Sequence, residues 1–245
     1  MCGVIPNSIE FIYSIEGCDY LKSEDDLDEL YKLGLRSILP DWNEKNKFGS
    51  SFKSEEGLTD LGKKLILRAI ELGIMIDVSH ANLKTFNDIL EIIELEKAKG
   101  KDINVIASHS NLKTLCKRER NLSDTQLIRL KDIGGYIGIF TNGKFLSLDN
   151  KKIGYEKRQE NFIKHLDYIL NKIKFPEDKI VISSDDMNFS PDTTYHNSEA
   201  FYLPNISVSL RRILKKYYKI DFVDKVMIDN SKKLIKKLNN KSVMK

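Results

Sequence analysis

Six short apolar segments alternate with amphipathic helical segments along this 245-residue chain, and that alternation restricts its fold more than any other feature. Each segment is rich in isoleucine or valine and is largely apolar throughout, which is typical of parallel strands buried on both faces. Strands that alternate with helices form βαβ units, which assemble into an open doubly wound sheet or a barrel. We therefore predict an α/β fold with strands at 9–15, 35–39, 74–79, 103–108, 135–140 and 179–184.

Capping residues delimit the predicted helices between these strands. Thr59 and Asn82 each precede an amphipathic segment as an N-cap, and Ser123 with Gln126 forms a capping box. Ser23 is expected to cap the first helix in the same way. Two nearly identical heptapeptides, SHANLKT and SHSNLKT, lie about one βα repeat apart. This internal echo supports regular βα units.

Composition excludes several other classes of protein. Hydrophobic residues make up 41% of the chain and charged residues 31%, which excludes a disordered chain, a collagen-like fibre and a disulfide-stapled miniprotein. There is neither an apolar run long enough to cross a membrane nor a basic leader typical of a secretory signal. The three cysteines form no CxxC pair, which favours reduced thiols. We predict one domain over residues 1–245, in the cytoplasm and without a membrane span.

The C-terminal segment, from about residue 207 to residue 245, is predicted to be a basic helical tail on a chain whose net charge is +4. Such a tail could bind nucleic acid or anionic lipid. However, the apolar residues of KKLIKKL share one helix face, so we interpret its lysines as a solvated face. No recognised nucleic-acid-binding motif accompanies them. We therefore predict no nucleic-acid partner.

Four of the predicted strands run into a residue that can bind a metal ion or a proton. These residues are Glu16, His80, His109 and Asp185. The carboxyl ends of parallel strands share one face, which carries the active site in barrel enzymes, so we expect the four side chains to converge. Two histidines with carboxylates suit Zn²⁺. Each residue alone has a structural alternative, such as a hydrogen-bonded histidine or a capping carboxylate, but two matching Ser-His pairs favour a metal site.

Other chemistry-bearing residues have less specific patterns around them. His165 lies inside a predicted helix and is interpreted as structural. His196 lies in a polar loop and could approach a substrate. Cys18 either faces the site or fills apolar space, and the second alternative is favoured. The chain has no P-loop, no dinucleotide-binding glycine motif and no nucleophile elbow.

These residues also carry a resemblance to a known family. The motifs SIEG (14–17), IDVSH (76–80), IASHS (106–110), RNLSD (120–124) and SSDD (183–186) resemble the membrane dipeptidases, or renal dipeptidase-like zinc hydrolases of peptidase family M19. The similarity runs from residue 8 to about residue 238. It implies a (β/α)₈ metallo-hydrolase barrel and a zinc-dependent dipeptidase, which hydrolyses the peptide bond of dipeptides by a metal-activated hydroxide.

The resemblance further implies a role for each matching residue. Glu16 would bridge two zinc ions, and His80 with His109 would complete one of the two zinc sites. Arg120 would pair with the terminal carboxylate of the substrate. Asp185 would pass a proton to the leaving amine. Trp42 lies in the loop after the second predicted strand, where the resemblance implies a residue near the substrate.

The chain departs from the family pattern near its N-terminus. Family members begin with a strand that ends in a His-x-Asp pair, which supplies two ligands of the other zinc ion. The first histidine here is His80, and we expect the chain to contain no such pair. About six of eight βα units would then be present, with exposed strand edges that favour a homo-oligomer. We expect at most one zinc ion, and the alternative function is a catalytically impaired remnant that acts as a binding protein or subunit.

Overall fold

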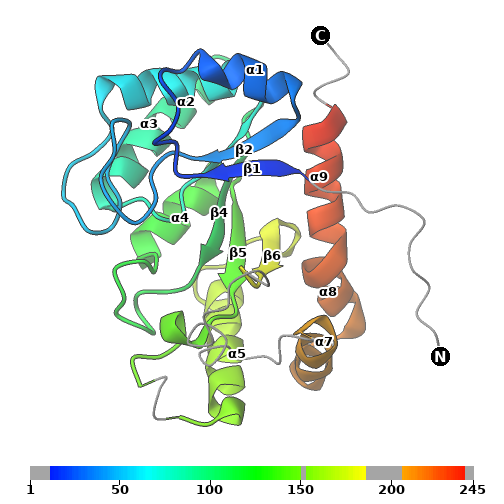
Figure 1. Ribbon diagram of the computed structural model, residues 1–245. Coiled ribbons are helices and arrows are strands. Elements are labelled where there is room, and N and C mark those ends of the chain that lie inside the picture. The colour runs from blue at the N-terminus through cyan, green and yellow to red at the C-terminus, as the bar shows by residue number, and fades with distance from the viewer. Residues whose placement is uncertain (1–11, 150–152, 186–205, 241–245) are drawn as a thin grey trace.

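A computed structural model describes residues 12–149, 153–185 and 206–240 (Figure 1). Its centre is a six-stranded sheet in which each strand pairs in parallel with its neighbour in the sequence. This arrangement confirms the predicted α/β fold with six parallel strands. The strands are β1 (Tyr13–Glu16), β2 (Leu35–Leu39), β3 (Met75–Asp77), β4 (Val105–Ser110), β5 (Tyr136–Phe140) and β6 (Ile180–Ser183).

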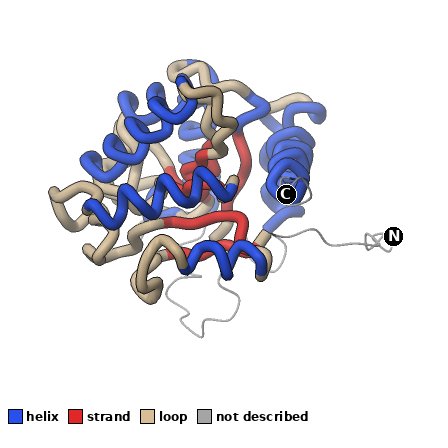
Figure 2. Tube along the Cα trace, turned by 90° about the horizontal axis from the view of Figure 1, so that it is seen from above, coloured by secondary structure: helices blue, strands red, loops and turns tan. Residues whose placement is uncertain are grey.

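Helices cover the sheet, and Figure 2 shows them grouped around the strands. None of those in the described ranges is long and apolar enough to cross a membrane. The described part of the predicted basic segment at the C-terminal end is helical apart from residues 218–219. The α-helices are α1 (Asp26–Lys32), α2 (Asp60–Leu72), α3 (Leu83–Ala98), α4 (Asp124–Asp132), α5 (Tyr155–Asn171), α7 (Ile206–Tyr217), α8 (Ile220–Asp224) and α9 (Asn230–Asn240).

Side-chain hydrogen bonds fix the starts of three helices as predicted. The Thr59 hydroxyl and the Asn82 side chain each accept a backbone N–H of the first turn, and Ser123 forms its capping box. The prediction for the first helix is wrong, because α1 takes Asp25 as its N-cap without a side-chain bond. The hydroxyl of Ser23 instead accepts the Asp25 N–H at 3.3 Å, in a turn that precedes the helix.

The two faces of the sheet pack against different helices. Successive side chains of a strand point to opposite faces. One set, exemplified by Ile76 and Ile137, joins the large core formed with α1 to α5, α7 and α8. The other set packs against Leu234 and Leu238 of α9, which lies along the opposite side of the sheet in Figure 1. The strand residues of this second cluster are Met75, Ile106, Tyr136 and Val181.

The two edges of the sheet are β1 and β6, which do not pair with each other among the described residues. The lack of two βα units predicts uncovered apolar surface on both flanking strands. That expectation is wrong for β6, because Ile180 and Val181 are buried, the second of them against α9. On β1, Ile15 is buried and only Tyr13, 46% exposed, presents a large ring to solvent. Helices therefore cover both faces of the sheet except at β1, where Tyr13, Ser14 and Glu16 are exposed.

Candidate metal centre

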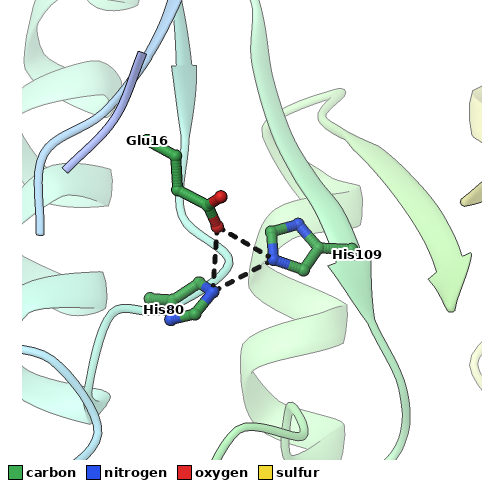
Figure 3. A group of neighbouring side chains, drawn as sticks. All are labelled: Glu16, His80 and His109. Atoms are coloured by element: carbon green, nitrogen blue, oxygen red, sulfur yellow. Dashed lines mark hydrogen bonds and ion pairs between the residues drawn. The ribbon is translucent and has the colours of Figure 1, made fainter. Parts of the chain in front are cut away.

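Parallel pairing brings Glu16, His80 and His109 together at the carboxyl edge of the sheet. Glu16 is the last residue of β1, His80 follows β3, and His109 lies within β4. The Nε2 atoms of the two histidines lie 3.0 Å apart. The Glu16 Oε1 atom lies 3.1 Å from Nε2 of His80 and 3.4 Å from Nε2 of His109. Figure 3 shows the three side chains pointing toward one another, as the sequence predicts.

The protonation states of these groups suit a metal ion. Burial alone would raise the pKa of Glu16, but the contacts of its carboxylate with the imidazoles of His109 and His80 outweigh it and hold that pKa well below its usual range. Burial lowers the pKa of His80 to about 4. At neutral pH the contact is therefore a carboxylate beside a neutral imidazole, not an ion pair. Metal ligands need these states, and this donor set fits Zn²⁺.

A pocket of about 610 Å³ opens beside this centre. The predicted substrate residues Trp42 and Arg120 line it, and so does the predicted proton carrier Asp185. Glu16 and His80 form part of the same wall. The structure thus brings every residue singled out for catalysis, substrate binding or metal binding to one pocket or to the adjoining centre.

Two aromatic side chains that the sequence interpretation missed accompany Arg120. Its guanidinium lies 6.0 Å from the ring centre of Phe52 and 5.6 Å from that of Phe145, within the range of cation–π contacts. Arg120 also donates a hydrogen bond to the Ser79 carbonyl oxygen at 3.3 Å. Both phenylalanines lie outside the strands, and no local pattern in the sequence distinguishes them. Two aromatic rings beside a guanidinium restrict the directions that it can take.

Asp185 lies two residues beyond β6 in a left-handed backbone conformation, with a φ of 47°. Aspartate tolerates this region better than most residues do. His196, which could approach a substrate, lies outside the described residues, and so does Asp186, the acidic neighbour of Asp185. Cys18 is completely buried, and its thiol lies 3.6 Å from the Leu39 carbonyl oxygen. This environment supports its interpretation as an apolar filler.

The expectation that the chain contains no His-x-Asp is wrong, since His165 and Asp167 form one on α5. Both side chains have structural partners. His165 is buried, with Nδ1 accepting the Leu112 N–H and Nε2 donating to the Leu146 carbonyl oxygen, each at 3.2 Å. Asp167 accepts the Tyr218 hydroxyl at 2.6 Å. The pair is not part of the group formed by Glu16, His80 and His109.

Acid is expected to destabilise the metal-free protein, because burial lowers the pKa of both His80 and His165 to about 4. An unfolded histidine binds its proton near pH 6.5, so between pH 6.5 and 4 only the unfolded chain gains that proton. Stability is then present above pH 6.5 and lost as the pH falls toward 4, by roughly 3 kcal/mol per histidine. Urea unfolding at pH 7.5 and pH 4.5 measures the change. His165→Gln is the control with a shallower dependence, and equal stability at both pH values would contradict the expectation.

The parallel sheet with a His-His-Glu group at its carboxyl edge is typical of metal-dependent hydrolases built on (β/α)₈ barrels. A family model described as membrane dipeptidase, peptidase family M19, matches residues 5–243. The chain therefore belongs to the membrane dipeptidase family. This finding confirms the resemblance read from the motifs.

Two individual relatives are similar to parts of the chain. The chain is 33% identical over 186 residues to an uncharacterized Klebsiella pneumoniae protein from the pqqA 5′ region, matching 72% of this chain and 65% of that protein. It is 34% identical over 119 residues to an uncharacterized Schizosaccharomyces pombe dipeptidase, matching 46% of this chain and 27% of that protein. The matched part of the chain thus spans less than two thirds of either relative.

Solved structures are similar to the fold. One is a Rhodobacter sphaeroides metallopeptidase liganded with a phosphinate mimic of the dipeptide L-Ala-D-Ala, with a TM-score of 0.73 and 26% identity over 92% of this chain and 62% of that chain. An amidohydrolase from Pseudomonas aeruginosa has a TM-score of 0.72 and 20% identity over 93% of this chain and 72% of that chain. The second similarity concerns the fold alone.

Proposed function

We propose that this chain is a zinc-dependent dipeptidase that hydrolyses the peptide bond of dipeptides. The observation that carries the proposal is the convergence of Glu16, His80 and His109 beside a pocket that also contains Arg120 and Asp185. Family membership supports it, as does similarity to a metallopeptidase whose ligand mimics a dipeptide. The assay is release of free amino acids from a set of dipeptides, with the zinc-loaded and the chelator-treated protein compared. No zinc-dependent release from any of them would contradict the proposal.

In this proposal Glu16, His80 and His109 hold one zinc ion. Bound there, zinc would supply a Lewis acid for the peptide carbonyl and lower the pKa of an attacking water. Zinc fits because two imidazole nitrogens and one carboxylate leave the fourth position of a tetrahedral ion open. The described residues contain one such ligand group, so at most one zinc ion per chain belongs to the proposal.

The chain's own residues would bind and orient the dipeptide in this pocket. Arg120 offers two parallel N–H donors to the terminal carboxylate, and Phe52 with Phe145 restricts the directions that its guanidinium can take. Trp42, 48% exposed, would cover the substrate from the loop that follows β2. Asp185 would accept a proton from the attacking water and donate it to the departing amine.

Arg120→Ala is expected to raise KM for a dipeptide about 10- to 100-fold with a smaller change in kcat, because an ion pair made in both ground and transition states contributes uniform binding. Steady-state kinetics on a dipeptide and on its C-terminal amide measure the effect. The amide should be hydrolysed poorly by both proteins, with little further loss in the variant. Arg118→Ala, a neighbouring pocket arginine, is the control with a far smaller change in KM. Equal losses on dipeptide and amide would contradict the carboxylate contact.

The second candidate function is a catalytically impaired family member that binds ligands or a partner subunit. It is favoured by the single ligand group among the described residues, where the family resemblance implies two zinc ions. Dipeptide binding without hydrolysis in the zinc-loaded protein would distinguish it from the enzyme.

We also propose that the chain assembles as a homo-oligomer and resides in the cytoplasm. The outer edge of β1, with which no described strand pairs, supports assembly, since its backbone groups can pair with another chain. The cysteines Cys18 and Cys116 form no disulfide, which supports a reducing compartment. Sedimentation of a monomer alone would contradict the assembly, and export of the protein from its cell would contradict the location.

A further inference from the structure

The serines of the two Ser-His pairs meet at one buried carboxylate. Asp77, the last residue of β3, is 6% exposed, and its side chain accepts bonds from both serines. Ser79 donates to Oδ1 through its backbone N–H at 3.0 Å and its hydroxyl at 2.7 Å. Ser108 donates its backbone N–H to Oδ1 at 3.1 Å and its hydroxyl to Oδ2. The repeated Ser-His sequence therefore has a structural counterpart at Asp77.

These contacts determine where the proton of His109 must lie. A serine hydroxyl has a single proton, and Ser108 gives its proton to Asp77. The Ser108 oxygen also lies 2.7 Å from Nδ1 of His109, so the proton in that contact must come from the imidazole. Nδ1 of a neutral His109 is then the donor, and Nε2 keeps its lone pair. The Ser79 oxygen accepts the backbone N–H of His109 at 3.1 Å, which holds the same residue from its main chain.

We infer that Asp77 is a positioning residue, which acts through the Ser108 hydroxyl to fix the Nδ1–H tautomer of His109 and so present its Nε2 atom to the metal ion. This inference rests on the metal site of the proposed function. The Nε2 atom points at Glu16 and His80, the other two residues of the group (Figure 3). An imidazole held in the opposite tautomer would direct an N–H into the centre and exclude a cation.

His80 shows that this arrangement is particular to one of the two histidines. Its Nδ1 atom is buried and has no hydrogen-bond partner among the described residues. The backbone N–H of Phe52 bonds to the His80 carbonyl oxygen at 3.0 Å and so holds the main chain of His80. Among the described residues, no hydroxyl bonds to the imidazole of His80 as that of Ser108 does to His109. Within the described residues, His109 is thus the ligand whose tautomer the protein itself determines.

Serine variants on β4 test the hydrogen-bond chain from Asp77 through Ser108 to His109, with zinc affinity as the measured quantity. Ser108→Ala removes the hydroxyl between Asp77 and His109 and is expected to weaken zinc binding about 10- to 100-fold, the usual effect of losing an outer partner of a ligand. Ser108→Thr keeps the hydroxyl and should remain close to the unaltered protein. Ser110→Ala is the matched control, because Ser110 flanks His109 on the same strand, is also buried, and has a hydroxyl without a partner among the described residues. Competition with a chelator measures the dissociation constants.

The tautomer itself is measured in the metal-free protein by ¹⁵N–¹H NMR of the imidazole, which requires no variant and no hydrolysis. The unaltered protein should show His109 with its proton on Nδ1, and Ser108→Ala should also populate the Nε2–H form. A proton on Nε2 in the unaltered protein would overturn the inference, as would equal zinc affinity in Ser108→Ala and Ser110→Ala. If both measurements agree with the inference and dipeptides are not hydrolysed, only the proposed function fails.

Discussion

Asp185→Asn is expected to lower kcat for dipeptide hydrolysis about 1,000-fold, the middle of the range for losing a general acid–base group. Asparagine keeps the size of the side chain and can neither accept the proton of the attacking water nor return it to the leaving amine. Zinc content should not change, because Asp185 lies outside the ligand group. Steady-state kinetics and metal analysis of the same preparation measure both quantities.

The control for this substitution is Asp178→Asn. Asp178 is exposed and precedes the opposite end of the strand that leads to Asp185. The Asp178→Asn variant should hydrolyse dipeptides as the unaltered protein does. An unchanged kcat in Asp185→Asn would show that Asp185 takes no part in the proton transfer. Loss of zinc from this variant would show that Asp185 binds the metal ion instead.

Glu16→Gln is expected to weaken zinc binding by roughly 100-fold or more. Losing an outer partner of a ligand costs up to about 100-fold, and losing the ligand itself should cost at least as much. The amide removes the negative charge that both histidine Nε2 atoms face, while it preserves the shape of the side chain. Hydrolysis should fall with the zinc content. Chelator competition at fixed pH measures the dissociation constant.

Glu119→Gln is the matched control for zinc binding. Glu119 lines the same pocket, but its carboxylate pairs with Lys113 at 2.6 Å and not with the histidines. The zinc affinity of the Glu119→Gln variant should equal that of the unaltered protein. Equal losses in the two variants would mean that the general charge of the pocket, and not a ligand at Glu16, holds the ion.

The strands and the convergence of the candidate site could be predicted because both depend on rules that act along one segment. An isoleucine-rich run such as 103–108 predicts a buried parallel strand, and parallel strands end at one edge of the sheet. The same rule predicts that Glu16, His80 and His109 lie together, as they do in the structure. Likewise, the N-cap at Thr59 follows from its own neighbours in the sequence.

Contacts between distant segments could not be predicted in this way. The periodicity of α9 predicts an apolar face, but it does not say that Leu234 and Leu238 cover the second face of the sheet. The position of Phe145 against Arg120 depends on how two loops pack, and neither loop has a periodic pattern. Ser23 illustrates a local error, because a serine before a helical segment can also form a turn.

The number of zinc ions bound per chain tests the central claim most directly. The protein is loaded with zinc, dialysed against metal-free buffer and measured by elemental analysis together with its concentration. The three ligands Glu16, His80 and His109 predict about one zinc ion per chain, lost in Glu16→Gln. Absence of zinc from the folded, unaltered protein would contradict the metal centre, and two tightly held ions would contradict the assignment of a single ligand group.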